Sequence, residues 1–301
     1  MIPVFDYSAA TLLMALGYTP TNLQFQVFGV SDAQAPENDS LIFVKTEITS
    51  ALIAGVKNCI FFAKENSGFD EGALNNSYVV YCASPKECYA NALLHIAAQT
   101  PKAQITPKDG RFISADAIIG TGTVIEPFCY IGANVHIGAN CRIGTGTKIK
   151  DNVIIGDNVT LGENCLIGID DADVYRPANG SCKTVPHCGG VKIEDGCLLL
   201  AGAMVAAGST CTTVIEKNSM VGMYGMVGHN CNVGAGTLIG GFANLGGHCH
   251  IAPNAYIGPK ACLSNRIQVG EKGYVSIGSV VLKDVDAETS VFGNPARKCL
   301  R

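Results

Sequence analysis

A branched or long aliphatic residue recurs at every sixth position over more than half of this chain. An α-helix needs an apolar period of 3.6 residues and a half-buried strand a period of two, so strict sixes fit neither. A short strand and a turn repeat naturally at six, and three such hexads make one triangular coil of a solenoid. The series comprises Ile113, Ile119, Ile125, Ile131, Ile137, Ile143, Ile149, Ile155, Leu161 and Ile167, then Ile193, Leu199 and Val205, then Ile215, Val221, Val227, Val233, Ile239, Leu245, Ile251, Ile257, Leu263, Val269 and Val275. The pattern predicts a mainly β protein of about nine stacked coils with the aliphatic ladder inside.

The positions around each aliphatic residue follow the same rule. Glycine commonly follows the aliphatic residue, and the residue two places before it is usually small. Six of the 14 cysteines occupy that small position, namely Cys129, Cys141, Cys165, Cys197, Cys231 and Cys249. We therefore interpret these six as packing residues of the interior, not as metal ligands or redox groups.

The hexads break twice. Residues 169–190, "IDDADVYRPANGSCKTVPHCGG", lose the phase and are rich in polar residues, so we expect a loop extruded from the solenoid. A shorter slip occurs near Cys211. Within the loop, Cys182, His187 and Cys188 could be zinc ligands, but their spacing matches no standard pair of ligand hooks, and their role stays open.

The first hundred residues have no hexads. The segments 25–31, 39–45, 58–64 and 77–83 are expected as strands, and 46–56 and 85–99 as helices. We therefore predict a small α/β domain over 1–100, a linker over 101–112, a β-helix over 113–286 and a C-terminal tail over 287–301.

Composition narrows the class of function. The chain has 35 glycines, no tryptophan, 15% charged residues and a net charge of −4, which makes a nucleic-acid partner unlikely. Its first residues show no basic region and too short an apolar run for a signal or membrane-spanning segment. We expect a cytoplasmic protein with reduced thiols.

Two motifs resemble a known family. "LIGIDDADVYR" followed by "KTVPHCGGVKIEDG" is similar to the extruded loop of the UDP-3-O-acylglucosamine N-acyltransferase family of lipid A synthesis, and "MVGHNCNVGAGTLIGG" is similar to its catalytic coil. The resemblance implies a left-handed parallel β-helix, a homotrimer, and active sites in the clefts between neighbouring prisms. It also implies an acyltransferase that uses a thioester and a nucleotide-linked amino sugar.

The resemblance assigns site residues. The histidine of the family's "HN" pair is the general base, which is His229 here, with Asn230 beside it in support. An imidazole with its ordinary pKa near 6.5 can accept a proton from an amine that attacks a thioester. The family's oxyanion-binding glycine amide matches Gly247, and three hexads per coil place it roughly 5 Å from His229 along the axis. We expect His229 to be exposed among its glycine neighbours.

Other positions depart from the family. Its second active-site histidine is replaced by Arg266, and of its nucleotide-binding residues only the aromatic that stacks on uracil is matched, by Phe43. A core role for Phe43 is the alternative. The ending "GNPARK" resembles CoA-dependent sugar acyltransferases, so Arg297 and Lys298 are candidates for CoA phosphates.

The leading hypothesis is an N-acyltransferase that joins an acyl group from CoA or acyl carrier protein to a UDP-linked amino sugar, with no permanently bound cofactor. The alternatives are a CoA-dependent sugar O-acetyltransferase and a non-catalytic β-helix scaffold. A zinc-dependent carbonic anhydrase on the same helix is disfavoured, because its three-histidine pattern includes an H-x₄-H pair that this sequence does not have. No metal is therefore expected.

Overall fold

The computed structural model describes residues 4–20, 23–45, 48–65, 67, 69–100 and 105–298. Contacts divide the chain into two compact units, each described by itself. The first comprises Met1–Pro101, Ala172–Gly189 and Ser209–Cys211. The second comprises Lys102–Asp171, Gly190–Gly208 and Thr212–Arg301. Residues 101–104 of the expected linker and 299–301 of the tail lie outside the described residues.

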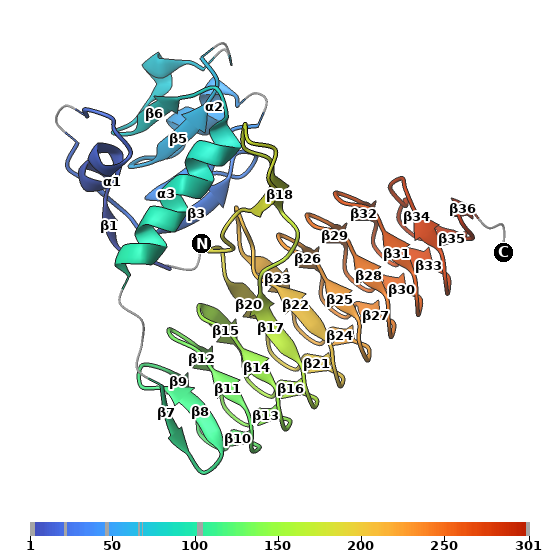
Figure 1. Cartoon of the computed structure of the whole chain (residues 1–301). Helices are drawn as coiled ribbons and strands as arrows, with labels where there is room; N and C mark the ends of the chain where they lie inside the picture. The colour runs from blue at the N-terminus through green and yellow to red at the C-terminus, as the bar shows by residue number, and fades with distance from the viewer. Residues whose placement is uncertain are drawn as a thin grey trace. The chain divides into compact units, whose positions relative to one another are not determined.

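The second unit is a parallel β-helix, which confirms the fold predicted from the hexads (Figure 1). Its strands form three sheets, of ten, ten and eight strands among the described residues. The first sheet contains β10 (Val124–Ile125), β13 (Arg142–Ile143), β16 (Thr160–Leu161), β21 (Leu198–Leu199), β24 (Met220–Val221), β27 (Leu238–Ile239), β30 (Tyr256–Ile257), β33 (Tyr274–Val275), β35 (Ser290–Phe292) and β36 (Arg297–Lys298). The second contains β7 (Ile105–Lys108), β8 (Arg111–Ser114), β11 (Tyr130–Ile131), β14 (Lys148–Ile149), β17 (Leu166–Ile169), β22 (Met204–Ala206), β25 (Met226–Val227), β28 (Asn244–Leu245), β31 (Cys262–Leu263) and β34 (Val280–Val281). The third contains β9 (Ile118–Ile119), β12 (His136–Ile137), β15 (Val153–Ile155), β20 (Val191–Ile193), β23 (Thr213–Ile215), β26 (Asn232–Val233), β29 (His250–Ile251) and β32 (Gln268–Val269).

The inward aliphatic residues of adjacent coils pair with one another. Ile131 lies between Ile113 and Ile149 in the second sheet, and the same register runs through the other two sheets. The six small-position cysteines are buried in the same core, as predicted. Ile119 is an exception with 37% of its surface exposed, because β9 is the edge strand of its sheet.

Both breaks in the hexads occur at one corner of the prism, between the second and third sheets. The first lies between β17 and β20, and the second between β22 and β23. The residues inserted there, Ala172–Gly189 and Ser209–Cys211, belong to the first unit. We call the turn between the second and third sheets the insertion corner.

The first unit is built on a parallel sheet of β3 (Gly29–Asp32), β4 (Ser40–Phe43), β5 (Ile60–Ala63) and β6 (Tyr78–Tyr81), in that order. Its other elements are the β1 (Tyr7–Ser8)–β2 (Gln26–Val27) pair, α1 (Ala9–Ala15), α2 (Ser50–Ala54), the short 3₁₀ helix η1 (Glu71–Ala73) and α3 (Pro85–Gln99). Helix α2 begins at Ser50, later than the sequence predicts, because the Thr49 side chain caps it by accepting the Leu52 amide. The expected helix residues 46 and 47 lie outside the described residues.

The inserted segments are held in the first unit by core packing and a buried polar network. The antiparallel pair β18 (Val174–Tyr175) and β19 (Lys183–Thr184) brings Tyr175 into the core of this unit. The Asp173 carboxylate accepts hydrogen bonds from Lys86 Nζ at 2.5 Å and Ser209 Oγ at 2.6 Å. The buried Tyr89 hydroxyl donates to the Ser209 carbonyl at 2.7 Å. The extruded segment is thus part of the structure of the first unit.

Candidate functional site

His229 lies in the insertion corner, in the turn between β25 and β26. Its ring is buried, with 5% of the residue exposed, so the expectation of an exposed side chain is wrong. The reason is that the imidazole itself occupies the space that Gly247 leaves on the next coil. A methyl group on Gly247 would come closest to His229 Nε2, and would lie 2.6 Å from Cε1 and 2.7 Å from Cδ2.

Asn230 orients the imidazole. Its Oδ1 lies 2.7 Å from His229 Nδ1, and an amide oxygen only accepts, so this contact selects the tautomer with the proton on Nδ1. Nε2, which faces Gly247, then carries the lone pair. Asn230 also has φ of 61°, the left-handed conformation that asparagine tolerates in turns. One residue therefore closes the turn and fixes the histidine.

The main chain of this turn is held by two side chains that the sequence analysis missed. The His229 amide donates to Asp171 Oδ2 at 3.1 Å, and the Asn230 amide donates to Thr213 Oγ1 at 2.9 Å. Asp171 stands just before one inserted segment and Thr213 just after the other. Nothing in the hexad pattern marks either residue, because both lie where the repeat is interrupted.

The Gly247 amide is a candidate donor for an oxyanion. At the equivalent turn position of other coils a carboxylate accepts the amide, as Asp151 does for Ala133 at 2.9 Å and Asp157 does for Ala139 at 2.7 Å. Within the described part of the chain, no such acceptor is found for the Gly247 amide. An unsatisfied main-chain N–H next to an imidazole is a suitable donor for a developing negative charge.

His248 is a further neighbour that the sequence analysis did not assign to the site. Its ring meets that of His229 edge to face, with centroids 5.1 Å apart. It holds φ of 60°, the left-handed conformation that Asn134, Asn152 and Arg266 also adopt at this corner of other coils. His250 lies on β29 with its side chain exposed. No cluster of three or more potential metal ligands occurs among the residues that the structure describes.

The structure brings only some of the candidate residues together. Arg266 joins His229 and Gly247 at the insertion corner, since its amide donates to the Gly247 carbonyl at 2.9 Å, and its side chain is exposed. Phe43 ends β4 in the first unit, half-buried, with its ring centroid 6.2 Å from that of Tyr89. Arg297 and Lys298 form β36 and are exposed. A role in binding for Phe43, Arg297 and Lys298 stays a prediction.

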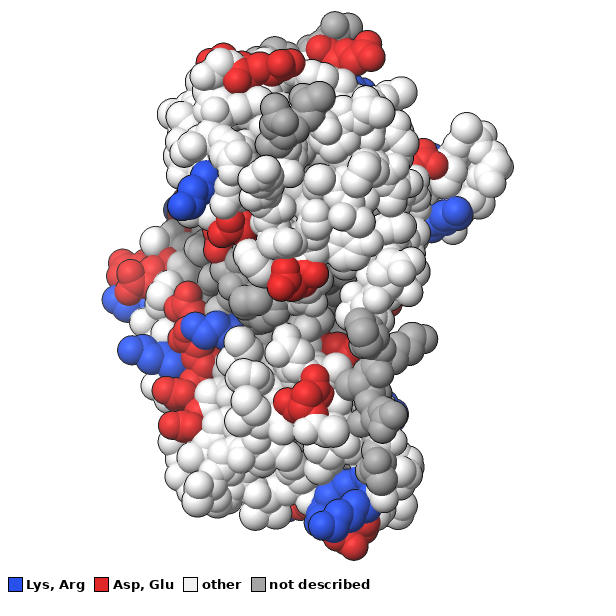
Figure 2. All heavy atoms as spheres, turned by 90° about the vertical axis from the view of Figure 1, so that its left-hand side faces the viewer, with Lys and Arg blue, Asp and Glu red and all other residues white. Residues whose placement is uncertain are grey.

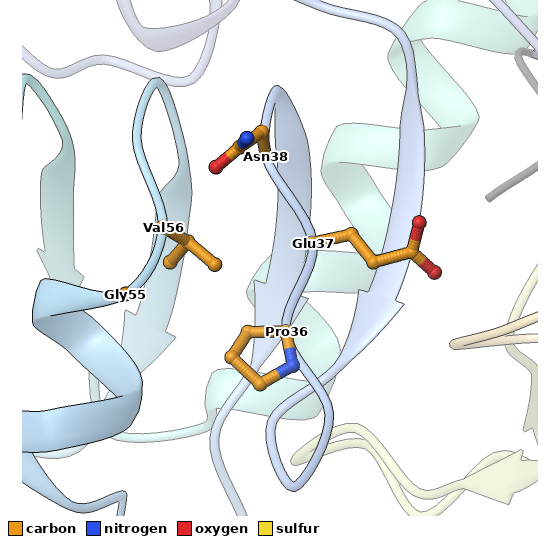
Figure 3. Close-up of a pocket in the computed structure, with 5 residues that line it drawn as sticks. All are labelled: Pro36, Glu37, Asn38, Gly55 and Val56. Carbon is orange, nitrogen blue, oxygen red and sulfur yellow. The ribbon is translucent and has the colours of Figure 1, made fainter.

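Three other surface features of the described residues were candidates for a site. A hollow of about 350 Å³ in the first unit is lined by Pro36, Glu37, Asn38, Gly55 and Val56, and the Glu37 carboxylate points away from Val56 (Figure 3). Cys182 is exposed and Cys188 packs against the core of the first unit. On the face drawn in Figure 2, acidic and basic side chains are scattered among uncharged ones. None of the helices in the described ranges is long and apolar enough to cross a membrane.

Comparison with known proteins agrees with the fold. Residues 116–151 and 134–168 match the family described as bacterial transferase hexapeptide (six repeats). The UDP-N-acetylglucosamine acyltransferase from Campylobacter jejuni superposes with a TM-score of 0.57 at 22% identity, over 64% of this chain and 73% of that one. The Francisella novicida UDP-N-acetylglucosamine acyltransferase gives 0.53 at 26% identity, over 64% and 69%. No curated protein sequence matches the chain. The hexapeptide transferase match and the Francisella novicida structure support an acyltransferase.

Proposed function

We propose that this protein transfers an acyl group from a thioester to the amine of a nucleotide-linked amino sugar, with UDP as the nucleotide. The observation that carries the proposal is the pairing of His229 with Gly247 on adjacent coils. The imidazole has Nδ1 held by Asn230 and Nε2 turned toward the glycine. A base and an oxyanion donor must both be within reach of one carbonyl carbon, and adjacent coils of a β-helix provide that spacing.

The reaction uses two features of this pair. As the amine nitrogen attacks the thioester carbonyl, His229 Nε2 accepts the proton that the nitrogen loses. The carbonyl oxygen becomes an oxyanion, which the Gly247 amide stabilises by donating a hydrogen bond. When the C–S bond breaks, the imidazolium returns its proton to the leaving thiolate, so that the products are an amide and a free thiol.

An oxygen acceptor is the second candidate, because Nε2 can equally accept a proton from a sugar hydroxyl. Two exposed cations at the C-terminal hairpin, Arg297 and Lys298, favour CoA as the donor. Charged side chains of this kind complement the phosphates of a nucleotide. Acyl carrier protein is the donor that the resemblance to the lipid A family implies.

The first unit is proposed to bind the nucleotide, with Phe43 against the base.

A homotrimer is proposed from the resemblance and is supported by the outward face of the first sheet. The outward side chains of β21, β24, β27, β30 and β33 are apolar or aromatic, namely Leu198, Met220, Leu238, Tyr256 and Tyr274. Tyr256 and Tyr274 stack with ring centroids 4.6 Å apart. An uncharged face of this kind suits burial against a second copy. The product would serve lipid A or surface-polysaccharide synthesis.

The test is a transfer assay read by mass spectrometry. The protein is incubated with UDP-linked amino sugars or UDP-N-acetylglucosamine, and with acetyl-CoA, longer acyl-CoA or acyl carrier protein thioesters. A product stable to hydroxylamine identifies an amide, and a labile one identifies an ester. No transfer from any donor, together with no binding of CoA or UDP, would instead support the non-catalytic scaffold.

A further inference from the structure

The β-helix holds its turns in register through main-chain hydrogen bonds between coils. At the insertion corner, the amide of the left-handed turn residue usually donates to a carbonyl one coil earlier. The His248 amide donates to the His229 carbonyl at 2.8 Å, and the Asn152 amide donates to the Ala133 carbonyl at 3.0 Å. Such bonds come from the main chain alone and need no particular side chain.

The turn that carries His229 is held by side chains at both of its first two amides, as is the turn of Ala133 and Asn134, whose amides donate to Asp151 and Asp116. Within the β-helix unit, the acceptor for the Asn230 amide is the side chain of Thr213, and the acceptor for the His229 amide is the side chain of Asp171. The coil that precedes His229 contains the inserted residues Ser209–Cys211, which belong to the first unit. What distinguishes the two acceptors of this turn is that Asp171 and Thr213 flank the inserted segments.

Both acceptors are themselves placed by regular structure. Strand β17 continues to Ile169, which pairs with Ala206 of β22, and the Ala207 amide donates to the Ile169 carbonyl at 2.9 Å. Asp171 follows two residues later. Thr213 is the first residue of β23, is completely buried and pairs with Val191 of β20. Neither acceptor depends on a long unsupported loop.

We propose that Asp171 and Thr213 are positioning residues for His229. They fix the main chain at residues 229 and 230, so that Asn230 Oδ1 can hold His229 Nδ1 and keep Nε2 against Gly247. The expected effect on catalysis rests on the proposed function. The expected effect on the position of the His229 ring does not. A base held within a few tenths of an ångström is used more effectively than one that rotates.

The test compares two disruptive variants with two that keep an acceptor. Asp171→Ala and Thr213→Val remove the acceptor oxygen, whereas Asp171→Asn and Thr213→Ser retain one. Asp151→Ala is the matched control, because Asp151 accepts the turn amide of Ala133 at the same corner of another coil. Hydrogen exchange of the 229–230 amides and the ¹⁵N spectrum of the His229 ring report its position without any substrate. Transfer kinetics report the effect on kcat and KM.

We expect amide exchange at 229–230 to rise at least about tenfold in Asp171→Ala and Thr213→Val, with loss of the Nδ1–H tautomer. The kcat should fall by about tenfold or more with KM unchanged. Asp171→Asn and Thr213→Ser should restore all readouts, and Asp151→Ala should leave them unchanged.

Unaltered exchange and tautomer in the disruptive variants would overturn the inference. So would a loss of kcat in Asp171→Ala that Asn fails to restore while the amide is protected again, because charge would then matter instead of position. If the unmodified protein transfers no acyl group from any donor, the proposed function fails. The exchange and ring spectra then still decide whether Asp171 and Thr213 position His229.

Discussion

The imidazole of His229 lies against the Cα atom of Gly247, one coil further along the β-helix. A Cβ atom at residue 247 would be 2.6 Å from His229 Cε1, closer than carbon atoms can approach. Gly247 does not have a positive φ, so space and not backbone conformation requires glycine there. We therefore expect Gly247→Ala to push the imidazole aside and to lower kcat by at least about tenfold, measured by acyl transfer.

The matched control for this variant is Gly241→Ala. Gly241 occupies the equivalent turn position of another corner, where an added Cβ would meet the Met223 carbonyl at 3.2 Å. Gly241→Ala should remain folded in a thermal melt, and its kcat should stay near that of the unmodified protein. Equal kcat values for the two variants would contradict the assigned role of Gly247.

His229→Ala removes the proposed base. General-base catalysis contributes about 10² to 10⁴ in rate, so kcat should fall by at least about 10²-fold. The side chain is buried, and a parallel thermal melt separates the loss of activity from unfolding. His250→Ala, on the exposed outward face of β29, is the control and should keep its activity. Retained activity in a folded His229→Ala protein would exclude this histidine as the base.

The fold could be predicted from sequence because its main determinant is local and periodic. An inward aliphatic residue at every sixth position leaves few arrangements other than coils of three hexads, and the register of Ile113, Ile131 and Ile149 follows directly. The insertions could be predicted for the same reason, because an interruption of the six-residue pattern can be recognised in the sequence as readily as the pattern itself. The cysteines were interpreted correctly from their small inward positions.

The surroundings of the candidate site could not be predicted in the same way. Asp171 and Thr213 reach residues 229 and 230 only because two insertions meet at one corner, and no period relates them. The burial of His229 depends on the ring turning toward Gly247, which a repeat pattern does not specify. A single sequence shows which residues share a column, but not which way a side chain in that column turns.

Binding of CoA tests the donor proposed from the C-terminal hairpin. A ligand that binds only the folded state stabilises it by about 2.7 kcal/mol at a hundredfold excess over Kd, which a thermal-shift titration detects. The double substitution of Arg297 and Lys298 by Ala should weaken the shift, and added salt should weaken it in the unmodified protein. Lys272→Ala is the control, because its ammonium lies 3.7 Å from both Glu271 and Glu288. A saturable shift of the same size in the unmodified protein and in the double variant would mean that the CoA phosphates bind elsewhere.

The stability of the β-helix at high pH follows from its buried thiols. Burial raises the pKa of Cys165 to about 11, and also raises the pKa of Cys129, Cys141 and Cys197 above the ordinary value of 9. Well below pH 9 these thiols are protonated in both the folded and the unfolded state, so their ionisation does not affect the free energy of unfolding. Above pH 9 the unfolded chain loses protons that the folded chain keeps, so the free energy of unfolding falls as pH rises toward 11. Urea denaturation at several pH values from 7 to about 10.5 should show this fall. Cys165→Ala should make it shallower, whereas replacing the exposed Cys182 should not. An equal slope in Cys165→Ala and the unmodified protein would mean that this thiol does not contribute to the loss of stability.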